Sequence, residues 1–139
     1  MLESVAILLV RGGSEYVLQH RDNKPTIADP DTYSTWGGRV EAQDKSMYAA
    51  AIRELKEETG TACAEADLQY LGDEQMQSRS PDIKSQDLTV HYFALEIDSG
   101  TAVESFEGQG VIVLPKPYQP TPKVNPITKE AIKRYETAA

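Results

Sequence analysis

Residues 37–61 read GGRVEAQDKSMYAAAIRELKEETGT. The two glycines permit a sharp turn or a close approach to a ligand, so the stretch predicts a loop, then a helix, then a stop. Residues 47–58 contain no glycine or proline and are rich in Ala, Leu, Lys and Glu, which are strong helix formers. Asp44 or Ser46 can cap the start of this helix, and Gly60 is the expected residue just past its end.

The predicted helix has two distinct faces. One arc carries apolar or small side chains that can bury against a core: Tyr48, Ala51, Ile52, Leu55 and Thr59. A neighbouring arc carries Glu54, Glu57 and Glu58, whose mutual repulsion costs roughly 0.2–0.5 kcal/mol per pair. This arc lies near the helix C-terminus, where the dipole disfavours anions, so folding alone would not select it. Because Mg²⁺ prefers hard oxygen ligands, a bound divalent cation would reverse the sign of the interaction.

Glutamates are common on solvated helix faces, and Glu57 and Glu58 alone would be explained that way. The glycine pair, the Arg-Glu and the closing Glu-Glu-x-Gly together favour a functional site. Residues 38–61 resemble the signature box of Nudix hydrolases. In that box a Gly, five residues, a Glu and seven residues precede Arg-Glu-apolar-x-Glu-Glu-x-Gly-apolar. The second half matches at Arg53, Glu54, Leu55, Glu57, Glu58 and Gly60.

The first half of the box departs from the pattern. One extra residue separates Gly38 from Arg53, and the first Glu is absent. Counting forward from Gly38 reaches Asp44, whereas counting back from Arg53 reaches Lys45. We place the extra residue in the loop 42–45, because the helix register after this loop is intact. The sequence leaves open whether Asp44 or Lys45 takes over the role of the missing Glu.

The resemblance implies the Nudix fold, an α/β/α sandwich with a mixed β-sheet, in a single domain over residues 1–139. It implies hydrolysis of a nucleoside diphosphate linked to another moiety, with Mg²⁺, or Mn²⁺ as a substitute, as cofactor. The implied metal ligands are the Gly37 carbonyl, Glu54, Glu57, Glu58 and Glu107. Glu54 or Glu107 would be the base for the attacking water. Arg53 would hold Glu57 by a charge-assisted pair.

Glu107 enters through a second, shorter resemblance. Residues 104–110 read ESFEGQG and precede the apolar run 111–114. Some Nudix enzymes of the MutT type carry Glu-Gly-Gln in the loop before a late strand, where the Glu supplies a metal ligand or the base. Glu107-Gly108-Gln109 is similar and occurs at the same place in the order of elements. The alternative is an exposed glutamate in a plain turn.

The rest of the pattern predicts strands on both sides of the helix. We expect strands at 4–10, 16–20, 67–77, 87–97 and 111–114. The first two form a hairpin. Asn125 can cap a final helix that has Pro126 at its first position. These elements suggest a mixed sheet between two helical layers.

Residues 22–35 form a loop that is longer than most hairpin connections, and such loops are often functional. Arg21 at its start either reaches a substrate phosphate or stays solvated. Trp36 at its end either stacks on a base or sugar of the substrate or packs in the core.

Composition limits the partners. The 139 residues are enough for one domain with a real core, and the net charge of −8 argues against nucleic acid and against an anionic membrane surface as partners.

The run 5–10 is too short for a membrane span and lacks a basic flank, so it does not predict a signal peptide. The single cysteine, Cys63, fits a cytoplasmic location. The oligomeric state stays open, and a homodimer is one option.

Three functions compete. The favoured one is a metal-dependent Nudix pyrophosphohydrolase acting on a small-molecule, nucleotide-type substrate. The second is a nucleotide-binding or sensing module on the same fold with weak catalysis, supported by the irregular first half of the box. The third is a protein-interaction domain with an acidic helix. The group linked to the diphosphate is not fixed: nucleoside triphosphates, nucleotide sugars and dinucleoside polyphosphates all remain open.

Overall fold

The computed structural model describes residues 2–138, and within them the chain forms one seven-stranded sheet and two α-helices. In chain order the strands are β1 (Leu2–Arg11), β2 (Glu15–His20), β3 (Tyr33–Ser34), β4 (Trp36–Arg39), β5 (Leu68–Gln77), β6 (Asp87–Ile97) and β7 (Gly110–Pro115). The helices are α1 (Met47–Thr59) and α2 (Pro126–Thr137), and short 3₁₀ turns span Glu65–Asp67 and Pro81–Ile83. No helix in this part of the chain is long and apolar enough to cross a membrane.

β1 is the central strand of the sheet. It pairs in parallel with β6 along its whole length and antiparallel with β2 and β4. Ser4–Ile7 pair with β4, whereas Leu9–Arg11 pair with β2, so these two strands share the edge of β1 that β6 leaves free. The strand order is β3-β2-β1-β6-β5, with β7 added against β2. The sheet is therefore mixed, as the sequence suggested.

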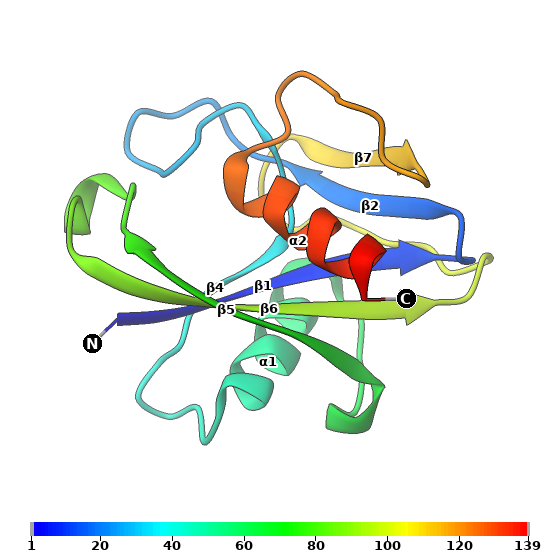
Figure 1. Ribbon diagram of the computed structural model, residues 1–139, viewed down its shortest axis with the longest axis horizontal. Helices are drawn as coiled ribbons and strands as arrows, with labels where there is room; N and C mark the ends of the chain where they lie inside the picture. Colours follow the sequence, from blue (N-terminus) through cyan, green and yellow to red (C-terminus); the bar gives the residue numbers. More distant parts are fainter. Residues whose placement is uncertain (1, 139) are drawn as a thin grey trace.

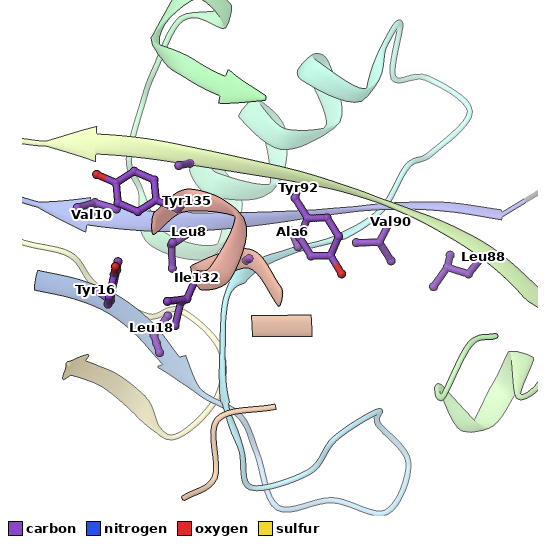
Figure 2. Packing of buried hydrophobic residues seen from close by; sticks show 12 residues of the cluster. Ala6, Leu8, Val10, Tyr16, Leu18, Leu88, Val90, Tyr92, Ile132 and Tyr135 are labelled. Carbon is purple, nitrogen blue, oxygen red and sulfur yellow. The ribbon is translucent and has the colours of Figure 1, made fainter. Parts of the chain in front are cut away.

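The two helices cover opposite faces of the sheet (Figure 1). Side chains along a strand point alternately to its two faces, so β1 contributes to two cores. The core under α1 includes Val5, Ile7, Leu9, Phe93, Ala50, Ala51 and Leu55. The core under α2 includes Ala6, Leu8, Val10, Tyr92, Ala131, Ile132 and Tyr135 (Figure 2). This α/β/α sandwich confirms the predicted fold class.

Helix α1 begins and ends where the sequence predicts. The Ser46 hydroxyl accepts a hydrogen bond from the Ala49 amide at 3.1 Å, and Gly60 ends the helix in the left-handed conformation with φ of 73°. Met47–Thr59 is α-helical throughout. The extra box residue therefore lies in the loop before Ser46, as expected. Asn125 caps α2 by accepting from the Thr128 amide at 2.9 Å.

Two short strands lie where the sequence predicted loops. Strand β3, Tyr33–Ser34, is inside the expected loop 22–35 and pairs with β2. Gly37 and Gly38 were also expected in a loop, but both lie in strand β4, opposite Ala6 and Val5 of β1. Glycine weakens a strand because it has no side chain to pack, so the local pattern gave no strand signal. Here the pairing with β1 decides the conformation.

Candidate active site

Helix α1 turns two of its three glutamates toward strand β4. The Gly37 amide donates to Glu58 Oε1 at 2.8 Å, and Glu58 is only 8% exposed. Glu54 is also buried, and its Oε1 lies 2.7 Å from the position that a Cβ on Gly38 would occupy. Glu57 stays exposed on the outer side of the helix. Two carboxylates of the predicted triad are thus buried against the glycine pair.

The two glycines are required for different reasons. Gly37 has φ of 140°, and a Cβ there would lie 2.0 Å from the Val5 carbonyl oxygen, so the close pairing of β4 with β1 demands glycine. Gly38 instead leaves space for the Glu54 carboxylate. The resemblance to the Nudix box implied a different reason for the glycines, a metal-ligating carbonyl at Gly37. The structure supplies a steric reason for both.

Burial dominates the electrostatics of these carboxylates. Desolvation raises the pKa of Glu58 to about 8; the Gly37 amide and Arg21 oppose the shift, and the charges of Glu54 and Glu107 add to it. The pKa of Glu54 is raised as well, chiefly by burial, although Arg53 works against the shift. In the protein without a bound cation, the nearby positive charges therefore do not offset the effect of burial on Glu54 and Glu58.

Arg53 organises the outer side of the group. Its Nε and Nη2 donate to the two carboxylate oxygens of Asp44 at 2.9 and 2.8 Å. Its Nη1 donates to Glu54 at 3.1 Å and to Glu57 at 3.3 Å, which confirms the predicted pair with Glu57. Lys45 is exposed, whereas the side chain of Asp44 is 4% exposed, so Asp44 is the one of these two residues that contacts Arg53.

The loop that carries Glu107 lies against the end of α1. The Phe106 amide donates to the Glu58 carbonyl at 2.9 Å, and the Gln109 amide donates to the His20 carbonyl at 2.7 Å. Glu107 itself is exposed, yet its charge is close enough to raise the pKa of Glu58. The structure therefore brings this loop to the acidic group, on the side expected from the sequence.

A cavity of about 160 Å³ opens beside the glycine pair. Its walls include Gly37, Gly38 and the apolar side chains Met76, Ile83, Leu88, Val90 and Ile127. Three arginines also line it. Arg39 pairs with Asp82 at 2.7 Å and Arg79 pairs with Asp29, but no ion pair involves Arg21 within residues 2–138. The Arg21 guanidinium donates through Nε to the Ala28 carbonyl at 3.0 Å.

The NUDIX domain profile matches residues 2–124, which is most of the chain. This chain belongs to the Nudix family. A search of curated proteins found no match.

Solved structures with this fold cover nearly the whole chain. The NUDIX domain of Shewanella oneidensis NrtR, complexed with ADP ribose, has a TM-score of 0.74 at 16% identity and covers 99% of this chain and 88% of that one. The E. coli dihydroneopterin triphosphate pyrophosphohydrolase has a TM-score of 0.74 at 16% identity, with 99% and 96% covered. A MutT/nudix family protein from Enterococcus faecalis has a TM-score of 0.65 at 18% identity, covering 81% of this chain but only 43% of its own length. At such identities the likeness shows the fold alone.

Trp36 is a core residue of this Nudix chain, although it also borders the cavity. Its side chain is 1% exposed, packs in the core under α1, and donates through Nε1 to the Val17 carbonyl at 2.9 Å. The suggestion that the ring stacks on a base is therefore wrong, and the packing alternative is right. Side chains point alternately to the two faces of a strand, and the Trp36 side chain in β4 points to the face covered by α1, away from solvent.

The donor chemistry of the Nudix box fits a divalent cation. As the side chains stand, no three His, Cys, Asp or Glu residues between positions 2 and 138 are grouped closely enough to hold a metal ion. The charges of Glu54 and Glu107 nevertheless both raise the pKa of Glu58, and a hard cation would relieve this repulsion. Glu57 is held by Arg53 beside them.

Proposed function

We propose that this chain hydrolyses a diphosphate bond in a nucleoside diphosphate linked to another moiety, with Mg²⁺, or Mn²⁺ in its place, as cofactor. The observation that supports this best is the acidic group of Glu54, Glu58 and Glu107 beside Arg21 at the edge of the cavity. An acidic group attracts metal ions, and a guanidinium without a carboxylate partner suits a phosphate. The two are close, because Arg21 lowers the pKa of Glu58 while it also lines the cavity.

The residues then divide into three roles. Glu54, Glu57, Glu58, Glu107 and the Gly37 carbonyl would hold the metal, which when bound neutralises phosphate charge and activates water. Arg21 would bind and orient a phosphate. Glu54 or Glu107 would accept the proton of the attacking water.

Arg53 acts on these groups indirectly. It is anchored by Asp44 and donates to both Glu54 and Glu57, so it fixes the orientation of two carboxylates. A fixed carboxylate loses less conformational entropy when it binds a cation, which favours a preorganised site.

The alternative is a nucleotide-binding module with weak catalysis. Its support in the sequence was the irregular first half of the box. In this chain Asp44 provides a carboxylate partner for Arg53 despite the extra residue, which supports the hydrolase over the binding module.

The wider setting follows from composition. A net charge of −8 favours a small-molecule substrate over nucleic acid, and a single cysteine fits the cytoplasm. Residues 1–139 would form one functional domain. The proposed activity uses residues of one chain and therefore does not depend on whether the protein forms a homodimer.

The test is a hydrolysis screen over nucleoside triphosphates, nucleotide sugars and dinucleoside polyphosphates. We expect turnover of at least one class with Mg²⁺, none with EDTA, and none with Glu58→Gln. Glu104→Gln is the matched control, because Glu104 is exposed and lies outside the acidic group. Binding of nucleotides without turnover in any class would select the binding module instead.

A further inference from the structure

Asp31 joins three segments of the chain that are far apart in sequence. Nε2 of His20, at the end of β2, lies 2.8 Å from Asp31 Oδ1, and Gln109 Nε2 donates to the same oxygen at 3.0 Å. Lys123, in the connector before α2, donates to Oδ2 at 3.0 Å. Both carboxylate oxygens are therefore used, and each partner comes from a different part of the fold.

The chemistry of a carboxylate fixes the direction of these bonds. An ionised carboxylate only accepts, so His20 carries a proton on Nε2 and donates to Asp31. The contact of 3.3 Å between Gln109 Nε2 and His20 Nε2 then joins two donors that converge on one oxygen. Hydrogen bonds from Lys123, His20 and Gln109 lower the pKa of Asp31 to about 2, so it stays ionised near neutral pH.

Gln109 uses its side-chain amide to connect Asp31 with the end of β2. One N–H goes to Asp31 and the other to the Arg21 carbonyl, at 2.8 Å. Arg21 does not depend on this bond. Its own amide donates to the Thr32 carbonyl at 2.8 Å, and its guanidinium is held by Ala28.

Glu107 lies between two anchors of its loop. On one side, Phe106 is bonded to the Glu58 carbonyl on α1. On the other, Gln109 is held by Asp31 and by the His20 carbonyl. Gly108 has φ of 77°, and a Cβ there would lie 2.5 Å from the His20 carbonyl oxygen, so the chain passes directly against the end of β2. Without the Gln109 side chain, the loop would keep the backbone bond from Gln109 to His20 and the bond from Gln19 Nε2 to the Glu107 carbonyl at 3.4 Å, but it would lose its connection to Asp31.

We propose that Asp31 is a positioning residue: through Gln109 it fixes the loop that carries Glu107 against the acidic group. This inference rests on the proposed function, in which Glu107 is a metal ligand or the base. Asp31 touches neither substrate nor metal and acts through the loop. Changes to residues that orient a metal ligand commonly cost about 10–100-fold in affinity or activity.

The experiment is a double-mutant cycle with two readouts, kcat on the hydrolysed nucleotide and affinity for Mn²⁺ alone. Asp31→Asn tests the carboxylate, and Asn tolerates the left-handed backbone that Asp31 has at φ of 58°. Gln109→Ala tests the connection. Each is measured in the wild-type chain and in Glu107→Gln. The matched control is Asp22→Asn in the same loop, where the carboxylate pairs with Lys24 on the surface at 3.5 Å.

We expect Asp31→Asn and Gln109→Ala each to lower kcat and Mn²⁺ affinity about tenfold, with KM and melting temperature little changed. In the Glu107→Gln background each should change both readouts less than about twofold, because the residue they position is already neutral. Asp22→Asn should match wild type.

Losses of the same size in both backgrounds would show a general structural role and overturn the proposal. A loss of kcat and Mn²⁺ affinity with Gln109→Ala but none with Asp31→Asn would show that the bond from Gln109 to the Arg21 carbonyl is enough to hold the loop. That result would also overturn the proposal for Asp31. If no nucleotide is hydrolysed, the proposed function fails, but the Mn²⁺ cycle still decides whether Asp31 positions Glu107.

Discussion

Asp44 holds the Arg53 guanidinium through both carboxylate oxygens, at 2.9 Å to Nε and 2.8 Å to Nη2. The Glu41 amide donates to the same carboxylate at 2.8 Å, so Asp44 also closes the loop before α1. A loop that is one residue longer carries a side chain that is one methylene shorter, and the charged group still reaches Arg53. The extra residue in the box therefore does not prevent a carboxylate of this loop from reaching Arg53.

Replacement of Asp44 by alanine should destabilise the protein. It removes a bidentate, mostly buried partner of Arg53, and hydrogen bonds to charged groups contribute about 2 kcal/mol. Thermal melting should show a decrease of roughly 6 °C. Asp98→Ala is the control, because Asp98 is exposed in the turn after β6. Equal melting temperatures for Asp44→Ala and Asp98→Ala would show that the pair contributes nothing.

The contribution of Asp44 should depend on pH. The hydrogen bonds from Arg53 lower the pKa of Asp44 in the folded state below its unfolded value, which is about 4. The stabilisation is therefore complete above about pH 4 and is lost as the pH falls through the lower, folded pKa. Urea denaturation of wild type and of Asp44→Asn should give a constant difference in the free energy of unfolding from pH 7 down to about pH 4. Below that pH the difference should become smaller. A difference that grows with acidity would contradict the assignment.

Two neighbouring glycines should respond differently to alanine. In Gly37→Ala the new Cβ meets the backbone oxygen of Val5 at 2.0 Å and φ is unfavourable, so we expect a loss of about 3 kcal/mol or more. In Gly38→Ala the Cβ meets only the end of the Glu54 side chain, which can move. Gly38→Ala should therefore melt close to wild type and bind Mn²⁺ about tenfold more weakly. If both variants unfolded alike, the steric distinction between the glycines would be wrong.

Glu57→Gln should separate metal binding from folding. The Glu57 side chain is 58% exposed, so its neutralisation should leave the melting temperature of the metal-free protein unchanged. An amide is a poorer ligand for Mg²⁺ and a weaker partner for Arg53, so most Mg²⁺-dependent turnover should disappear. Glu65→Gln, another exposed glutamate, serves as the control. Turnover at the wild-type rate would remove Glu57 from the metal site.

The sequence was most informative where structure is local. Helix α1, its Ser46 cap and its Gly60 end follow from propensity and capping, and the side-chain alternation in β6 follows from a period of two. Strand β4 could not be found in this way, because Gly37 and Gly38 form a strand only through pairing with β1. Counting residues left Asp44 and Lys45 equal, since loop geometry rather than spacing decides which one faces Arg53.

Long-range contacts were beyond any pattern in the chain. Gln109 and Asp31 are 78 residues apart and meet only because β7 pairs with β2. Trp36 gave an ambiguous signal, since an indole suits both a binding surface and a core, and only the position of β4 resolves it. The Glu107 motif was informative because its place in the order of elements puts it at the end of β2, beside α1.

Glu107→Gln is the sharpest test of the site. The loop of Glu107 is bonded to the Glu58 carbonyl, and the charge of Glu107 reaches the Glu58 carboxylate, yet Glu107 is exposed. Neutralisation should therefore leave the metal-free melting temperature unchanged or slightly higher, because one repulsive charge is removed. If Glu107 is the base, kcat should fall about 10²-fold or more, with Glu104→Gln at the wild-type rate. A fall of less than about threefold, well short of that scale, would exclude Glu107 as the base. The proton of the attacking water would then go to Glu54, a buried carboxylate whose pKa is raised chiefly by desolvation, or to another residue.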